Sequence, residues 1–258
     1  MKNFITLFIK EMQESMRNGK WIWLPIVIMI IGISQPLTSY YMPQIIESAG
    51  NLPEGAVIEI PTPSGEEVLA GTLGQYGTLA TLLFVLATMS AISYERQSGT
   101  LTLVMARPVQ PIQYILSKWA AQLVITLASL LLSYVLTWYY TNLLFDKVDW
   151  NIMLASLGVY SLWIVLIISV TIFAGTLLRT SGGIAGVSVS FLALLTVSTG
   201  LFTKFMEWSP AKLREHATAI LMQGELLENG LLVIVATLSL SLLLVLLATF
   251  NFKRFEQF

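Results

Sequence analysis

Long apolar stretches separated by short polar segments make up most of the chain, and this pattern predicts an all-α membrane protein. A helix needs roughly 20 apolar residues to cross a bilayer core. Six stretches have that length and end at a charge, a proline or a glycine: residues 21–41, 73–93, 118–145, 152–178, 182–203 and 230–250. We therefore expect one transmembrane domain over residues 1–258, with six spanning helices.

The first 19 residues follow a different pattern, that of an amphipathic helix. Apolar residues recur there at helical spacing, and charged residues occupy the other side. The apolar face consists of Ile5, Phe8, Ile9, Met12 and Met16. Asn18-Gly19 is a typical helix stop. We expect residues 1–19 to lie in the membrane interface, either as a simple anchor or as a contact for a cytosolic partner.

Composition agrees with a membrane protein and excludes several functions. Of the 258 residues, 55% are hydrophobic and 11% are charged, whereas a soluble domain has about 25% charged residues. The mean hydropathy is +0.75. The net charge of −1 argues against nucleic acid as a partner. The absence of cysteine excludes disulfides, thiolate nucleophiles and cysteine-ligated metals.

The distribution of Lys and Arg predicts which side of the membrane each segment faces. With the N-terminus inside, ten of the 14 basic residues lie on the inner side and four on the outer side. We therefore expect both termini in the cytosol of a multi-pass cell-membrane protein. The extracellular loops would be residues 42–72, which are acidic, and residues 204–229.

The predicted spans are almost free of ionisable residues. Apart from Lys118, which begins the third, they contain no Asp, Glu, Lys, Arg or His. Ion-coupled carriers and intramembrane metalloenzymes need such residues at membrane depth. The chain also lacks the G-x-x-x-x-G-K-[ST] loop that holds ATP phosphates. We expect no catalytic site and no metal site in this chain, and an energy source outside it.

Residues 94–117, between the second and third spans, carry a dense polar pattern on the inner side. Ser98 or Thr100 is placed to cap a helix start, and Pro108 and Pro111 would end that helix and redirect the chain. Its apolar face would consist of Leu101, Val104, Met105 and Pro108. We expect a short helix parallel to the membrane. It is either a lever that a cytosolic partner pushes or a simple re-entry loop.

This segment resembles the signature of ABC-2 type permeases, the membrane subunits of one class of ATP-binding-cassette transporters. The signature has an acidic–basic pair, a Gly-Thr, a leucine, a basic–proline pair and a lysine at the next span. The matching residues are Glu95, Arg96, Gly99, Thr100, Leu103, Arg107, Pro108 and Lys118. The interfacial helix, the six spans and the cytosolic ends also match the family, in particular the small permeases of Bacillus-like two-component exporters.

The resemblance implies a type V exporter-like fold in a bacterial cytoplasmic membrane. Two permease chains, here expected to be identical, would form the pathway, and two copies of an ABC ATPase would dock beneath them and hold ATP and Mg. Residues 98–108 would be the coupling helix, seated in a cleft of the ATPase, with Glu95 at the junction with the second span. The turn at Arg179 would make a second, smaller contact.

Small polar residues within the spans are further candidates. The resemblance implies that spans two and five face the pathway, although such side chains commonly bond only to their own backbone. The possible lining residues are Gln75, Thr78, Thr81, Thr88, Ser188 and Thr196. Gly182, Gly186 and Ser190 form a small-xxx-small face. That face either packs inside the subunit or contacts a second chain or the pathway.

Alternatives remain open from the residues alone. A non-transporting membrane scaffold or sensor that docks a cytosolic protein would use the same loop. A membrane enzyme would have to rely on outer-loop carboxylates such as Glu66 and Glu67. In the last outer loop, residues 208–228 predict one or two short helices lying on the outer face, where we expect His216 to be solvated or interfacial.

Overall fold

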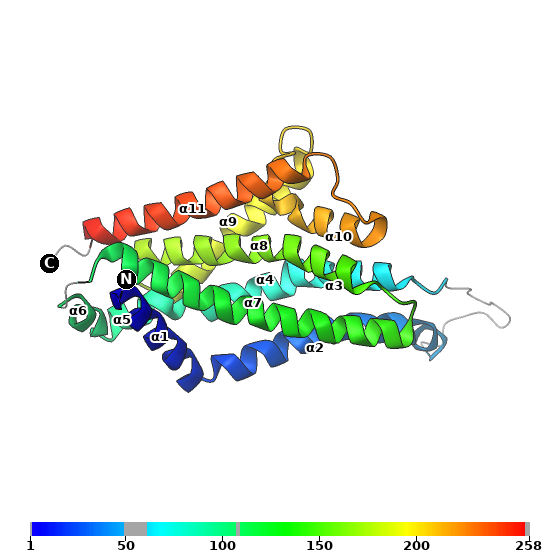
Figure 1. Ribbon diagram of the computed structural model, residues 1–258, viewed down its shortest axis with the longest axis horizontal. Helices are drawn as coiled ribbons and strands as arrows, with labels where there is room; N and C mark the ends of the chain where they lie inside the picture. Colours follow the sequence, from blue (N-terminus) through cyan, green and yellow to red (C-terminus); the bar gives the residue numbers. More distant parts are fainter. Residues whose placement is uncertain (1, 49–60, 107–108, 256–258) are drawn as a thin grey trace.

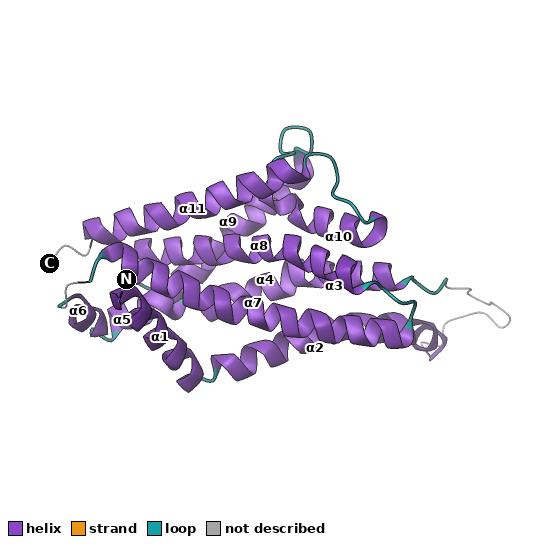
Figure 2. Cartoon of the chain, in the orientation of Figure 1, coloured by secondary structure: helices purple, strands orange, loops and turns teal. Residues whose placement is uncertain are grey.

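The computed structural model describes residues 2–48, 61–106 and 109–255, and these form a bundle of helices with no strand among them (Figures 1 and 2). The helices are α1 (Lys2–Arg17), α2 (Lys20–Ser48), α3 (Gly65–Gln75), the π-helix η1 (Tyr76–Ala80), α4 (Thr81–Thr88), α5 (Ser90–Gln97), α6 (Thr100–Met105), α7 (Pro111–Leu144), α8 (Trp150–Leu177), α9 (Ser181–Leu201), the 3₁₀ helix η2 (Pro210–Lys212), α10 (Leu213–Gln223) and α11 (Gly230–Phe255).

Six helical segments in the described residues are long and apolar enough to cross a membrane, which confirms the six predicted spans. Span two, Gly65–Gln97, is built from α3, η1, α4 and α5 in succession. The other five are Lys20–Ile46, Pro111–Leu144, Trp150–Leu177, Ser181–Leu201 and Gly230–Arg254. The N-terminal part of α1 and the C-terminal end of α11 lie at the same end of the bundle as α6, which we call the α6 end; α10 lies farther toward the opposite end (Figure 1).

Two spans start earlier than predicted. Span two begins at Gly65 because Ser64 and Glu67 form a capping box, each accepting a hydrogen bond from the other's backbone N–H. Span three begins at Pro111, a favoured first helical position. The predicted outer loop over residues 42–72 was therefore too long. Its first part continues α2, its last part belongs to α3, and residues 49–60 lie outside the described residues.

The predicted amphipathic helix at the N-terminus is present as α1. It ends at Arg17, and Gly19 takes the left-handed conformation that closes the turn (φ 67°). Ile5, Ile9 and Met16 are exposed, as an apolar face directed toward lipid requires. The opposite face packs against α7 and buries Glu11.

Helix α8 forms the centre of the bundle, and α9 lies at its margin. In the most apolar 18-residue window of each, 72% of α8 is buried but only 22% of α9. Beside α8, the rings of Tyr76, Tyr134 and Tyr160 are fully buried, with the Tyr76 centroid 6.3 Å from each of the other two. The bundle thus has a well-packed centre, and α9 is the least covered of its six spans in the described residues.

The segment between α9 and α11 packs more deeply than predicted. Two short helices, η2 and α10, are present as expected, but α10 packs against α8 and α3 rather than lying free on the surface. Leu213, Ala217 and Leu221 are buried in this contact. His216 shares the buried side of α10, so the expectation of a solvated or interfacial histidine was wrong.

Candidate functional site

Five side chains at the α6 end form a buried network that we call the ion cluster: Lys10, Glu11, Glu95, Tyr114 and Lys118. Lys118 Nζ lies 2.9 Å from Glu11 Oε1 and 3.1 Å from Glu95 Oε1. The Tyr114 hydroxyl donates to Glu95 Oε2 at 2.6 Å. Lys10 also pairs with both carboxylates. The cluster therefore joins α1, the end of span two and α7.

The charges of the ion cluster balance, which explains how they can be buried. Glu95 and Lys118 are only 2% and 1% exposed, and an unpaired charge at such a site would be costly. Burial by itself would lower the pKa of Lys10, but the carboxylates of Glu11, Glu95 and Glu14 outweigh it and raise that pKa above its ordinary value. Glu11, Glu14 and Glu95 lie close enough together to suggest a metal site. Lys10 and Lys118 already neutralise two of these carboxylates, so the geometry favours an ion-pair network.

The ion cluster changes the interpretation of two predicted residues. Glu95, expected to mark a junction that contacts the partner, has its carboxylate turned into the subunit and fully engaged there. Lys118, expected at a span boundary, lies well inside α7 because that helix begins at Pro111. Glu11 and Tyr114 were missed. Lys118 could have indicated them, since a buried cation in an apolar helix requires a carboxylate partner nearby.

A second set of contacts joins α5 to the turn between α8 and α9. Arg96 donates to the backbone oxygens of Gly175 (3.3 Å) and Leu178 (3.0 Å). Gln97 donates to the backbone oxygen of Arg179 at 2.9 Å. The two segments that were predicted separately as contacts for the ATPase therefore lie side by side, and the Arg179 side chain is exposed at their edge.

Helix α6 is short, and its start differs from the prediction. Its N-cap is Gly99, in the left-handed conformation (φ 73°), and neither Ser98 nor Thr100 caps it with a side chain. The Ser98 hydroxyl instead bonds to the Glu95 backbone and to the Thr100 hydroxyl. The left-handed turn, which favours glycine, takes the place of a side-chain cap.

One side of α6 is buried and the other projects from the protein. Leu101 is 3% exposed, whereas Leu103 is 71% exposed. Of the predicted apolar face, Leu101 is buried, and Val104 and Met105 are partly buried against the core. Arg107 and Pro108, which were predicted to complete the segment, lie outside the described residues.

A groove of about 550 Å³ runs between α1 and α6. Leu7, Leu103, Val104 and Val109 supply its apolar walls, and Thr100 and Lys10 are among its polar members. The ion cluster lies directly behind it, because Lys10 belongs to both. The arrangement gives a protruding apolar side chain and an adjoining hollow, which together suit a protein surface better than a small polar ligand.

A second groove, which we call the membrane groove, lies between span two and α9 and has a volume of about 380 Å³. Thr78, Thr81 and Thr196 line it with Trp163 and Leu192, so three of the predicted lining residues line the same groove, two from span two and one from α9. All three hydroxyls donate to their own backbone. The Trp163 indole N–H in turn donates to the Thr81 hydroxyl at 3.1 Å. Because these polar groups are bonded within the protein and most of the lining is aliphatic or aromatic, the groove suits an apolar or amphipathic molecule.

The other three predicted lining residues do not belong to the membrane groove. Gln75 donates to Gln35 and accepts from Ser34, tying α3 to α2. Thr88 and Ser188 are buried, and their hydroxyls have no hydrogen-bond partner among the described residues. Of the six predicted lining residues, three thus line the membrane groove, Gln75 holds two helices together, and Thr88 and Ser188 are buried elsewhere.

The small-residue face of α9 is uncovered. Gly182, Gly186 and Ser190 are all exposed, and a Cβ added to either glycine would meet no atom within 4 Å. The interpretation in which this face packs inside the subunit was therefore wrong. A contact with another chain or with the pathway remains as the alternative.

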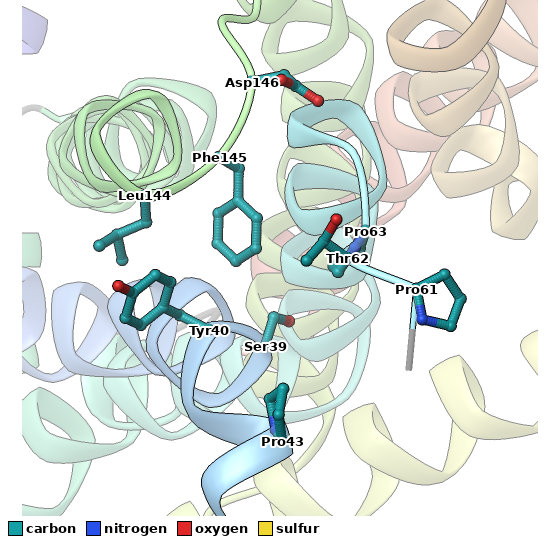
Figure 3. A pocket seen from close by; sticks show the side chains of 9 residues that line it. All are labelled: Ser39, Tyr40, Pro43, Pro61, Thr62, Pro63, Leu144, Phe145 and Asp146. Atoms are coloured by element: carbon teal, nitrogen blue, oxygen red, sulfur yellow. The ribbon is translucent and has the colours of Figure 1, made fainter. Parts of the chain in front are cut away.

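A third hollow, of about 340 Å³, lies where α2 and α7 end, away from α6 (Figure 1), and Figure 3 shows the side chains that line it. Its walls are the ring of Phe145, the ring of Tyr40 at 6.2 Å in an edge-on contact, and three prolines. Asp146 is its one charged lining residue. The described lining residues assemble no nucleophile, base or set of metal ligands, and they belong to neither the ion cluster nor the membrane groove.

Comparison with known proteins gives two consistent results. Residues 5–250 match the family model described as ABC-2 family transporter protein. The chain is also 37% identical, over 258 residues that cover all of both chains, to the uncharacterized transmembrane protein YxlG of Bacillus subtilis (strain 168).

Proposed function

The chain belongs to the ABC-2 family of transporter proteins, and from that premise we propose that it is the permease subunit of an ATP-driven exporter. Membership makes it a multi-pass membrane component of a transport system. We further propose that the chain forms part of the translocation pathway. A separate ABC ATPase subunit would bind ATP and Mg and supply the energy.

The observation that carries the proposal is the construction of α6. Its exposed Leu103 and the α1/α6 groove offer a docking surface. The ion cluster behind them joins α1, α7 and the end of span two, and the Thr100 hydroxyl of α6 donates to the Glu95 backbone oxygen at that end. A push on α6 would therefore move several spans together instead of bending a loose loop. We assign Gly99, Thr100 and Leu103 to this coupling surface, with Arg179 at its edge; Glu95 and Arg96 act from inside by holding it in place.

The α6 end then faces the cytosol of the bacterial cell. This orientation is supported by the excess of Lys and Arg on that side in the sequence, and it puts both termini there as well (Figure 1). The acidic first outer loop and α10 would face outward. We further propose that two identical chains meet, with α9 and its small-residue face among the contacting surfaces, and that two ATPase copies serve them.

Co-expression with the host's candidate ABC ATPase subunits tests the proposal. We expect one of these ATPase subunits to co-purify with the native chain. The Leu103→Glu variant should fold but should no longer retain the ATPase, because a charge replaces the projecting apolar side chain. Leu226→Glu is the matched control, since Leu226 is exposed in the outer segment, and it should keep the ATPase. A native chain that retains no ATPase in gentle detergent would contradict the proposal.

Reconstitution tests transport itself. With the ATPase present, ATP should drive solute across the vesicle membrane in the outward direction. A complex that binds and hydrolyses ATP but moves no solute from a broad panel of amphiphiles, peptides and ions would instead favour a scaffold or sensor.

A further inference from the structure

We propose that the membrane groove takes a single-chain amphiphile with an anionic head group, and that Arg214 selects the charge. The inference rests on the proposed export function and names a substrate class for it. Two observations on different elements carry it: an apolar groove between span two and α9, and an unpaired guanidinium held at its edge by α10.

The first observation is the position of Arg214. Its side chain lies across Gly77, where a Cβ built on the glycine would be 3.0 Å from Arg214 Nη1 and 3.2 Å from its Cδ. Gly77 itself lines the membrane groove. It also belongs to the π-helix η1, and such π-helical turns are frequent at functional sites. The absence of a side chain at residue 77 is what lets the guanidinium reach the groove's edge.

The second observation is the lack of a counter-charge. Within the described part of the chain, no carboxylate pairs with Arg214 and no acceptor takes a hydrogen bond from it. The cations of the ion cluster at the α6 end, by contrast, are neutralised inside the subunit. A guanidinium carries five donors and binds a carboxylate or a phosphate in a bidentate manner. Arg214 is thus available to an anionic group placed beside Gly77.

The groove below Gly77 fits an apolar chain. Leu82, Trp163, Val189 and Leu192 supply aliphatic and aromatic walls, and the threonine hydroxyls are already bonded to backbone oxygens. Its volume of about 380 Å³ falls in the range of small-molecule sites. An amphiphile would place its chain between span two and α9 and its anionic head at Arg214, toward the α10 end.

The cysteine-free chain allows a direct binding test. A single cysteine at Thr196→Cys, in the groove, is labelled with a maleimide in zwitterionic nanodiscs without any ATPase. Dodecanoate should protect it at roughly tenfold lower concentration than dodecanol, the ratio expected for one charge-assisted hydrogen bond. Leu194→Cys, exposed on the same helix and not part of the groove, should show no such preference.

The role of Arg214 is tested in the same assay. Arg214→Gln should abolish the preference for dodecanoate, whereas Lys204→Gln, which removes another outer cation, should keep it. Equal protection by the two probes in the native background, or a preference that survives Arg214→Gln, would overturn the proposal. Protection that appears only in nanodiscs containing anionic phospholipid, with no response to dodecanoate, would also overturn it and assign the groove to a bilayer lipid. Because no ATPase is present, none of these outcomes bears on coupling.

Discussion

The ion cluster and the small-residue face of α9 differ in the contacts that the subunit itself gives them. The cluster gathers four charges and satisfies all of them internally. The α9 face has no charge, and the chain leaves it bare. Charges that are paired inside fix the shape of the α6 end, whereas small uncharged residues left outside can meet another surface. Under the proposed function, the ion cluster would transmit a movement, and the α9 face would make contacts with another molecule.

Breaking the ion cluster should have the largest effect on the subunit by itself. Lys118→Met leaves Glu11 and Glu95 with Lys10 alone, so one buried negative charge loses its partner. We expect a loss of about 3–5 kcal/mol in the free energy of unfolding, measured by denaturant titration in mixed micelles. Lys253→Met, at an exposed lysine, should change that free energy by less than about 0.5 kcal/mol. Equal losses in the two variants would show that the cluster does not hold the α6 end together.

A change in the small-residue face of α9 should leave the stability of one subunit unchanged and weaken its self-association. Gly186→Leu adds bulk where the chain itself has no contact, so the stability of one subunit should stay within about 0.5 kcal/mol. Self-association should weaken roughly tenfold, because small faces allow helices of two chains to approach closely. Resonance energy transfer between labelled subunits in nanodiscs measures this self-association. The control is Gly158→Leu, at an exposed, uncontacted glycine of α8. Unchanged self-association in Gly186→Leu would remove this face from the proposed dimer.

A smaller contrast concerns glycine at the start of α6 and glycine in α9. Gly99→Ala forces a side chain into the left-handed region (φ 73°), at a cost of about 1–2 kcal/mol. Gly200→Ala, in helix α9 with open space around it, should stabilise by up to about 1 kcal/mol. The same unfolding titration should therefore show shifts of opposite sign. A shift of the same sign would argue that α6 does not need the left-handed turn.

The smallest expected effect is a pH dependence at His216. Burial lowers the pKa of this histidine, and its Nδ1 has no hydrogen-bond partner among the described residues. The folded protein therefore favours the neutral ring, and stability should be full above the ordinary histidine pKa of about 6.5 and decline as the pH falls below it. Thermal unfolding between pH 7.5 and 5.5 measures this decline. His216→Phe should flatten it; an equal decline in that variant would assign it to other groups.

The sequence predicted the six spans well because each is long, apolar and bounded by charge, proline or glycine. It placed two of their starts late, since Ser64 and Pro111 extend helices through residues that hydropathy alone assigns to loops. It also predicted α6 correctly as a short helix between the second and third spans. The contacts of Glu95 with Lys118 and Tyr114 inside the subunit could not be predicted. They depend on how α1 and α7 pack against span two, and the hydrophobic periodicity of a sequence does not predict such packing. The groove at Trp163 and the approach of Arg214 to Gly77 depend on tertiary packing in the same way.

The central claim is that α6 is the surface through which an ATPase acts on the membrane subunit. Because the chain has no cysteine, Leu103→Cys can carry a single photo-crosslinker in membranes that contain the co-expressed ATPase. Leu131→Cys, at an exposed leucine within the third span, serves as the matched site. We expect a covalent adduct with the ATPase from residue 103 and none from residue 131. An ATPase that binds the subunit but yields no adduct at residue 103 would contradict the claim.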